Sequence, residues 1–380
     1  MKFLVAFDSF KESLSGFEVG EAVRAGIEIA TPQESIRNCP ISDGGEGSME
    51  ALLSNFHAEE KSVTVHDALM RPIVAKYLLL DKYTVFIESA SCIGLANIPK
   101  EKRNLMKVTS FGLGEQMRDA ILAGYRNLII SLGGSATNDG GLGMLQALGW
   151  EFYDANDQLI DTSTNPLLHV HSFSEQNKMP ELKSCSITIL SDVSSPFYGK
   201  EGAAFIYAGQ KGATSEQILH LDCGLEKLAN ILKSKYDVDV QNIPGSGAAG
   251  GLGGSIVAAL NGVMKSGIDT MIELTNLEKY IIQSDIIFTG EGSLDKQSLN
   301  GKVPIGVAQL AKKHNKMVIG LAGRVDTDLN EMNQYLDAFF SIQTECRTLE
   351  EALAKEITHL QLSKTAEQIV RLMNARIGIH

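Results

Sequence analysis

Acidic side chains stand beside glycines or a lysine at three points of the sequence where a predicted β-strand ends. The three segments are Asp8-Ser9-Phe10-Lys11, Asp43-Gly44-Gly45-Glu46-Gly47 and Gly290-Glu291-Gly292-Ser293-Leu294-Asp295. Because the carboxyl ends of parallel strands meet at one edge of an open sheet, these side chains could share one crevice. Carboxylates there could hold Mg²⁺, and Lys11 could neutralise a phosphate. Asp-Gly and Gly-Gly also form ordinary turns, so a single such segment does not establish a site.

Two longer glycine-rich segments could bind phosphate through backbone amides. The first, residues 133–141, joins a predicted strand at 127–131 to a predicted helix at 140–149. Its candidate ligand-binding residues are Gly133, Gly134, Ser135 and Asn138. Amides and hydroxyls at a helix N-terminus suit an anionic group.

The second segment, residues 244–254, has a G-x-G-x-x-G pattern formed by Gly245, Gly247 and Gly250. Asp269 follows roughly where a ribose-binding acid would stand in a dinucleotide-binding protein. However, residues 238–243 make a poor buried strand and Pro244 interrupts it. A nucleotide-phosphate or hinge role therefore fits this segment as well as a dinucleotide site.

A further acidic residue, Asp192, follows the predicted strand at 187–190 and could be a metal ligand or general base. An ordinary strand-end turn is an equal interpretation. The sequence has no G-x-x-x-x-G-K-[ST], H-E-x-x-H or G-x-S-x-G pattern, and its eight histidines form no ligand cluster. A P-loop enzyme, a zinc protease of that type and an α/β-hydrolase are not indicated.

Composition excludes several classes of protein. A chain of 380 residues predicts two domains, and a formal net charge of −12 without a basic stripe argues against nucleic acid as the main partner. Five scattered cysteines without a C-x-x-C pair indicate reduced thiols. The apolar start ends at Asp8, and no segment is long enough to span a membrane. We therefore expect a cytoplasmic protein without a membrane partner.

Strands and helices alternate at both ends of the chain, which predicts a parallel α/β sheet covered on both faces. The middle differs, because residues 61–90 contain three successive short strands that favour antiparallel pairing. The expected fold is a Rossmann- or flavodoxin-like domain, residues 1–66 plus 285–380, with a mixed α/β domain inserted at residues 67–284. The active site is expected in the cleft between them.

Taken in order, these segments resemble the bacterial glycerate kinase family, the two-domain type that includes glycerate 2-kinases. The resemblance also rests on Gly209-Gln210-Lys211-Gly212-Ala213 and on the continuation to Gly301-Lys302. It departs at Ser194-Ser195-Pro196, where the family commonly has an Asn-Pro pair. The resemblance implies phosphoryl transfer from ATP to D-glycerate, a small-molecule substrate.

Within that reading, chemistry suggests roles for the candidate residues. Phosphoryl transfer needs positioning, charge neutralisation and orientation of the attacking hydroxyl. Mg²⁺ would be bound by Asp43 and Glu291, with Asp8, Lys11 and Asp192 also catalytic. Arg71 or Lys211 would pair with the glycerate carboxylate, beside Gly44 and Gly45. The two glycine-rich segments would hold the ATP phosphates.

Two alternatives remain open from the sequence. A nucleotide-linked hydroxy-acid dehydrogenase would rest on the glycine pattern at 245–250, and a non-catalytic sensor of a small acid could use the same two-domain cleft. The sequence favours 2-phosphoglycerate as product but leaves the 3-isomer open. It also leaves the oligomeric state open, a homo-oligomer being compatible with it.

Overall fold

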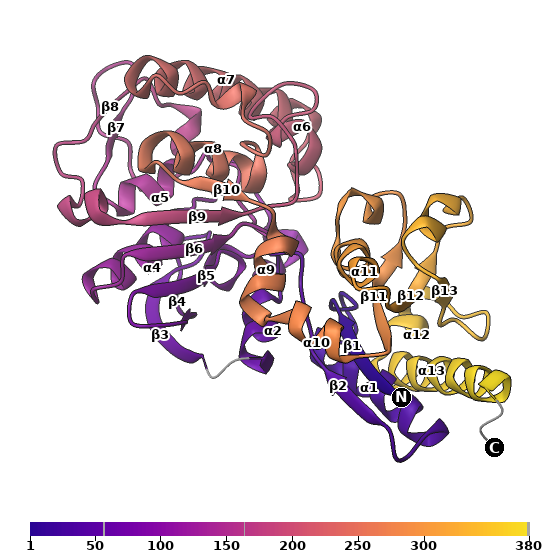
Figure 1. The fold of residues 1–380 in the computed structure, drawn as a ribbon. Helices are drawn as coiled ribbons and strands as arrows, with labels where there is room; N and C mark the ends of the chain where they lie inside the picture. The colour runs from indigo at the N-terminus through magenta and orange to yellow at the C-terminus, as the bar shows by residue number, and fades with distance from the viewer. Residues whose placement is uncertain (56–57, 163, 378–380) are drawn as a thin grey trace. The chain divides into compact units, whose positions relative to one another are not determined.

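The computed structural model describes residues 1–55, 58–162 and 164–377, and these divide into two compact units. The first unit combines residues 1–57 with 267–380, and the second comprises residues 58–266. Figure 1 shows that the N-terminal strands and the C-terminal third of the chain share one unit.

The first unit is built on a five-stranded parallel sheet with the order β13-β12-β11-β1-β2. Its strands are β1 (Lys2–Phe7), β2 (Ser35–Asn38), β11 (Ile286–Leu294), β12 (Met317–Val325) and β13 (Ala338–Ser341). Counted along the chain within this unit, the strand order is 2-1-3-4-5, the flavodoxin-like order. The expected sharing of one sheet by residues 2–7 and 285–290 is confirmed, because β1 pairs with β11 in parallel.

Helices cover this sheet on both faces. They are α1 (Gly16–Ala30), α2 (Ser48–Asn55), α9 (Gly267–Thr275), α10 (Leu277–Gln283), α11 (Val303–Lys313), α12 (Leu349–Leu353) and α13 (Lys355–Ile377). Helices α1 and α13 pack together over Phe3, Val5 and Phe7 of β1. Helices α10 and α11 pack on the same strands outside that apolar cluster. Because successive strand side chains point to opposite faces, this arrangement makes each central strand buried on both sides.

The second unit is built on a six-stranded mixed sheet with the order β10-β9-β6-β5-β4-β3. Its strands are β3 (Glu59–His66), β4 (Pro72–Leu79), β5 (Thr84–Glu88), β6 (Asn127–Ser131), β9 (Ser186–Leu190) and β10 (Val263–Lys265), and β7 (Glu151–Tyr153) pairs separately with β8 (Ser172–Ser174). The first three strands pair antiparallel, as their close succession predicted, and β5, β6, β9 and β10 run parallel.

The helices of the second unit share one continuous apolar core with this sheet. They are α3 (Ala90–Ile93), α4 (Phe111–Leu122), α5 (Leu142–Ala147), α6 (Ala203–Tyr207), α7 (Ser215–Tyr236) and α8 (Ala248–Leu260). Helix α7 begins at a capping box, in which Thr214 and Gln217 bond reciprocally to each other's backbone amides. Trp150, the only tryptophan of the sequence, is buried in this unit and donates from Nε1 to the Tyr236 hydroxyl at 3.0 Å.

The boundaries of the units differ from the expected ones in two places. Residues 59–66 form β3, which pairs along its whole length with β4 and so belongs to the second unit. Residues 267–284 contain α9 and α10, and α10 packs on β1 and α11 of the first unit. Short segments of this kind belong to the unit whose sheet or helices they pack against. Their local composition does not reveal which unit that is.

Two local predictions also need correction. Strand β11 continues to Leu294, so Glu291 stands on a strand instead of in a loop. The predicted helix at 140–149 is shorter, because left-handed Gly140 and Gly141 delay its start until Leu142. Residues 240–242 form a 3₁₀ turn before the second glycine-rich segment, which agrees with the expectation that residues 238–243 make a poor strand. Among the residues that the structure describes, no helix is long and apolar enough to cross a membrane.

Candidate functional site

Asp8, Asp43 and Glu291 all belong to the first unit and interact electrostatically. Asp8 directly follows β1, and Glu291 stands on the adjacent strand β11, where Gly290 pairs with Phe7. The junction between β1 and β11 is the switch point of a 2-1-3-4-5 sheet, where ligands of such sheets bind. The expected proximity of these three acidic side chains is therefore present in the structure.

The Asp8 carboxyl is held at this junction by local hydrogen bonds. The amide of Asp8 donates to the Gly290 carbonyl at 3.0 Å, and Asp8 Oδ1 accepts from the Ser9 amide at 2.6 Å. Its side chain is buried, and burial together with the nearby Asp43 carboxylate raises its pKa well above the ordinary value. A group with excess negative potential around it is prepared to receive a cation or a proton.

Glu291 is fixed by two partners from the segment that follows its own strand. Its Oε1 accepts from the Ser298 hydroxyl at 2.5 Å, and its Oε2 lies 3.4 Å from Lys302 Nζ. Burial raises the pKa of Glu291, although Lys302 and Ser298 oppose the shift. The carboxylate is therefore oriented by its surroundings, as a residue that acts on a bound group needs to be.

Asp43 occupies the tight turn between β2 and α2. Its Oδ1 accepts from the Gly45 amide at 3.0 Å, and Gly44 adopts a left-handed φ of 79°. The neighbouring Ser42 hydroxyl lies 2.7 Å from the Ser48 hydroxyl, which closes the turn. Asp43 is half-buried, and its charge raises the pKa of both Asp8 and Glu291. It is thus both a turn residue and a member of the acidic cluster.

The donors of this cluster suit Mg²⁺, which prefers carboxylate oxygens. Burial and neighbouring carboxylates disfavour the charged forms of Asp8 and Glu291 and raise their pKa values. A bound divalent cation would stabilise these charged forms. Within the described ranges, no three acidic, histidine or cysteine side chains already form a metal-binding group. Mg²⁺ commonly takes one or two carboxylates from a protein and its other ligands from water and phosphate.

In the second unit, Lys211 is buried beneath the first glycine-rich segment. Its Nζ donates to the Thr137 carbonyl at 2.7 Å and to the Ser135 hydroxyl at 3.2 Å, and its side chain is almost inaccessible. Burial lowers the pKa of Lys211 to about 7, against the opposing effect of Asp139. Through these hydrogen bonds, Lys211 stabilises the conformation of residues 133–138.

Asp139 anchors the same segment from inside. Its carboxylate accepts from the amide and hydroxyl of Ser110 at 2.7 and 2.8 Å, and from the amides of Gly141 and Gly143 at 3.0 and 3.2 Å. Gly134 remains exposed, whereas Ser135 and Asn138 are buried. The Asn138 amide atoms and Thr137 Oγ1 have no hydrogen-bond partner among the described groups. Such unsatisfied buried atoms are compatible with a bound water or ligand.

The glycines at 245, 247 and 250 serve close packing of backbone. A Cβ atom on Gly250 would stand 2.3 Å from the Thr137 carbonyl oxygen, and one on Gly247 would stand 2.2 Å from the Pro196 carbonyl oxygen. The Gly140 amide donates to the Gly250 carbonyl at 3.0 Å, so a backbone hydrogen bond joins the two glycine-rich segments. With a 3₁₀ turn before it, this segment lacks the strand that a dinucleotide-binding loop requires, which argues against the dehydrogenase.

Arg71 and Asp192 also lie in the second unit. The Arg71 guanidinium is paired with the buried Asp67 carboxylate, with 2.6 Å from Nε and 2.5 Å from Nη2 to Oδ2. Asp192 is half-buried just after β9, as its strand-end position predicted. Arg71 therefore closes a turn, and this pairing makes it a weaker candidate for the substrate carboxylate than the sequence suggested.

Sequence reasoning missed Ser298 and Lys302 as partners of Glu291. Lys302 stood in the Gly301-Lys302 pair of the resemblance, but no spacing rule connected it to Glu291. Its approach depends on the turn at residues 295–301, in which Gly301 adopts a left-handed φ of 93°. Lys302 follows Glu291 by eleven residues, a spacing that by itself does not indicate contact. The pairing could be predicted only if the conformation of this turn were already known.

The fold and the acidic cluster define a class of α/β proteins whose ligands bind beyond the carboxyl ends of parallel strands. Comparison with known proteins agrees with this class and identifies one family within it. A model described as the glycerate kinase family matches residues 3–374. The chain therefore belongs to the glycerate kinase family, and it is an ATP-dependent kinase.

Individual relatives are similar along nearly their whole length. A glycerate 2-kinase of Escherichia coli is 42% identical over 354 residues, which are 93% of each chain. A glycerate kinase of Bacillus cereus is 39% identical over 371 residues, 97% of each chain. A solved structure assigned as glycerate kinase 2 of Salmonella typhimurium is 38% identical with a TM-score of 0.84, and the match covers 100% of this chain and 99% of that one.

Proposed function

We propose that this protein transfers the γ-phosphoryl group of Mg²⁺-ATP to the 2-hydroxyl of D-glycerate. The observation that carries the proposal is the acidic cluster at the switch point, with Glu291 held by Ser298 and Lys302. Family membership supplies the kinase chemistry. The similarity to a glycerate 2-kinase supports attack by the 2-hydroxyl.

In the proposed reaction, Mg²⁺ neutralises the phosphates when it is bound, and Asp43 and Glu291 would hold it. Asp8, whose pKa is raised by burial and by Asp43, would accept the hydroxyl proton of glycerate. Lys11 is exposed three residues further on and would neutralise the transferred phosphoryl group.

The first glycine-rich segment is a candidate anion-binding segment within the second unit. Gly133, Gly134, Ser135 and Asn138 offer backbone and side-chain donors, and Lys211 holds them in place through Ser135 and Thr137.

The direct test is ³¹P NMR of the product formed from D-glycerate and Mg²⁺-ATP. We expect 2-phosphoglycerate, which enolase should consume without added phosphoglycerate mutase. A product that enolase consumes only with the mutase would show attack by the 3-hydroxyl. A clear preference for a sugar acceptor, or no turnover of D-glycerate, would overturn the proposed function.

A further inference from the structure

The first unit contains a pocket of about 780 Å³ that extends well beyond the acidic cluster. It runs along the carboxyl edge of β1, β11, β12 and β13, which are neighbours in the sheet. Neighbouring strands are about 4.8 Å apart, so this edge is about 14 Å long. Asp8 and Glu291 line the pocket near β1 and β11, and Ile342 and Gln343 line it after β13.

The two ends of the pocket differ in chemistry. Lys11 and Lys302 lie at the end near β1 and β11, where they could face phosphate oxygens. The end near β12, β13 and α12 is lined by apolar side chains, which include Val325, Leu349 and Leu353. Leu349 is 75% exposed at this wall, which leaves apolar surface available to a ligand.

Charged groups also line the end near β12, β13 and α12. Arg347 lines the pocket with a side chain that is only 17% exposed, and its Nη2 lies 2.9 Å from the Glu345 carboxylate. Its other terminal nitrogen, Nη1, has no hydrogen-bond partner among the described groups. Arg324 lines the same wall. Guanidinium groups of this kind favour planar or phosphorylated ligands.

We propose that this pocket binds the adenine nucleotide, with its nucleoside against β12, β13 and α12 and its phosphates toward Lys11 and Lys302. This inference rests on the proposed kinase function. Pockets for ligands of nucleotide size have volumes of about 300–1,000 Å³ and combine apolar walls with few polar groups. A three-carbon acid would fill only a small part of this space. The nucleotide is therefore assigned here instead of to the two glycine-rich segments.

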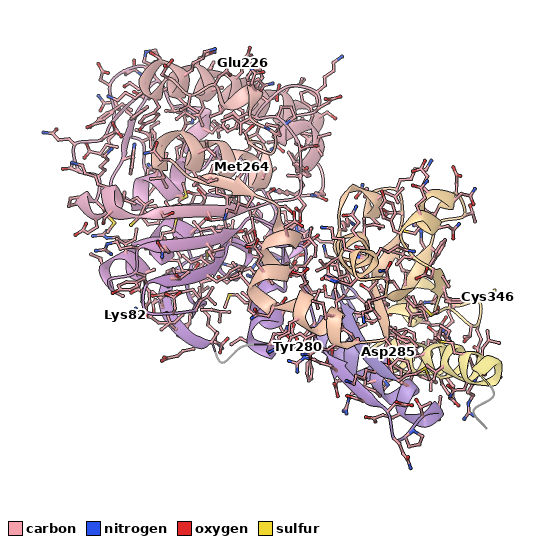
Figure 2. All side chains as sticks on the ribbon, in the orientation of Figure 1. Lys82, Glu226, Met264, Tyr280, Asp285 and Cys346 are labelled. Atoms are coloured by element: carbon pink, nitrogen blue, oxygen red, sulfur yellow. The ribbon has the colours of Figure 1, made fainter. Side chains whose placement is uncertain are left out.

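The position of Cys346 offers a direct test. Its thiol is exposed and lines the pocket. Cys346 lies on the segment between β13 and α12 and is labelled in Figure 2. Cys223 is also exposed, but it belongs to α7 in the second unit and serves as the internal control. The intact protein is alkylated with iodoacetamide, and mass spectrometry follows both thiols with and without the magnesium complex of a non-hydrolysable ATP analogue.

With the analogue at about 10 times its Kd, the free fraction of sites falls to about a tenth, so alkylation of Cys346 should slow about 10-fold. Alkylation of Cys223 should not change, and D-glycerate alone should not protect Cys346. Protection of Cys346 by D-glycerate alone would overturn the assignment. Unchanged alkylation in an enzyme that turns over ATP would also overturn it and would leave the proposed function standing. If the protein neither binds nor turns over ATP, the proposed function fails and this inference falls with it.

A matched pair of variants separates direct contact from a distant effect of ATP. Leu349 lies at the pocket wall and Leu372 on α13 outside its lining, and they are 75% and 71% exposed. Leu349→Asp should raise the KM for ATP about 10-fold, the low end for a lost apolar contact, and leave kcat and the KM for D-glycerate unchanged. Leu372→Asp should change none of the three. Equal KM values for ATP in the two variants would place the nucleoside elsewhere.

Discussion

Lys211 allows a quantitative test, because burial lowers its pKa from 10.5 to about 7. Between these values the unfolded chain binds a proton that the folded protein does not, so the free energy of unfolding must rise as pH increases. Each pKa unit corresponds to about 1.4 kcal/mol, so the complete effect is about 5 kcal/mol and is spread between pH 7 and pH 10.5. About 2 kcal/mol of it should appear between pH 7 and pH 9.

The perturbation is Lys211→Met, which removes the titrating amine and retains an unbranched apolar side chain. It also removes the hydrogen bonds to Ser135 and Thr137, a loss of about 1–3 kcal/mol for each acceptor left unsatisfied. That loss does not depend on pH. The stability of wild type minus that of Lys211→Met should therefore rise by about 2 kcal/mol between pH 7 and pH 9, whatever its value at pH 7.

The assay is urea unfolding followed by the fluorescence of Trp150, which is buried in the same unit as Lys211. Lys227→Met is the matched control, because Lys227 is an exposed lysine of α7 in that unit. The control should reproduce the pH dependence of the wild type. A difference between wild type and Lys211→Met that stays constant from pH 7 to pH 9 would refute the reasoning that Lys211 is buried with a lowered pKa.

Three further predictions concern catalysis, packing and the metal. Asp43→Asn should lower kcat about 100-fold or more with a smaller effect on KM, because the charge acts mainly in the transition state, whereas Glu46→Gln, at an exposed position of the same turn, should leave kcat nearly unchanged. Steady-state kinetics and an unchanged Tm check both variants, and near-full kcat in Asp43→Asn would show that Asp43 is only a turn residue. Gly250→Ala should lower the free energy of unfolding of the second unit by about 3 kcal/mol or more, because its Cβ would meet the Thr137 carbonyl oxygen at 2.3 Å. Gly199→Ala, where φ is 90° and nothing lies within 4 Å, should lower it by only about 1–2 kcal/mol. Similar urea midpoints for the two variants, followed by Trp150 fluorescence, would contradict this. Chelation with EDTA should abolish kinase activity reversibly while Trp150 fluorescence stays native, and full activity without divalent cations would remove Mg²⁺ from the mechanism.

The sequence by itself determined the elements of this protein and the family to which it belongs. The capping boxes at Thr214 and Ser15 fixed the helix starts, because side chains three residues apart satisfy the first backbone amides locally. The apolar runs at 2–7 and 286–289 specified central strands buried on both faces. The positions of Asp8 and Glu291 at or near strand ends followed from the same local patterns.

Tertiary structure decided which of these residues have partners and which glycines are structural. Residues 58–66 joined the second unit because β3 pairs with β4, a long-range choice that no local pattern encodes. Glu291 gained Ser298 and Lys302 through a turn, and Arg71 was paired with Asp67. The glycines at 245, 247 and 250 resembled a dinucleotide loop in sequence, but the backbone oxygens nearest to them come from residues 193, 196 and 137. Local patterns report which conformations a segment favours, whereas burial and charge depend on groups that only the folded chain brings together.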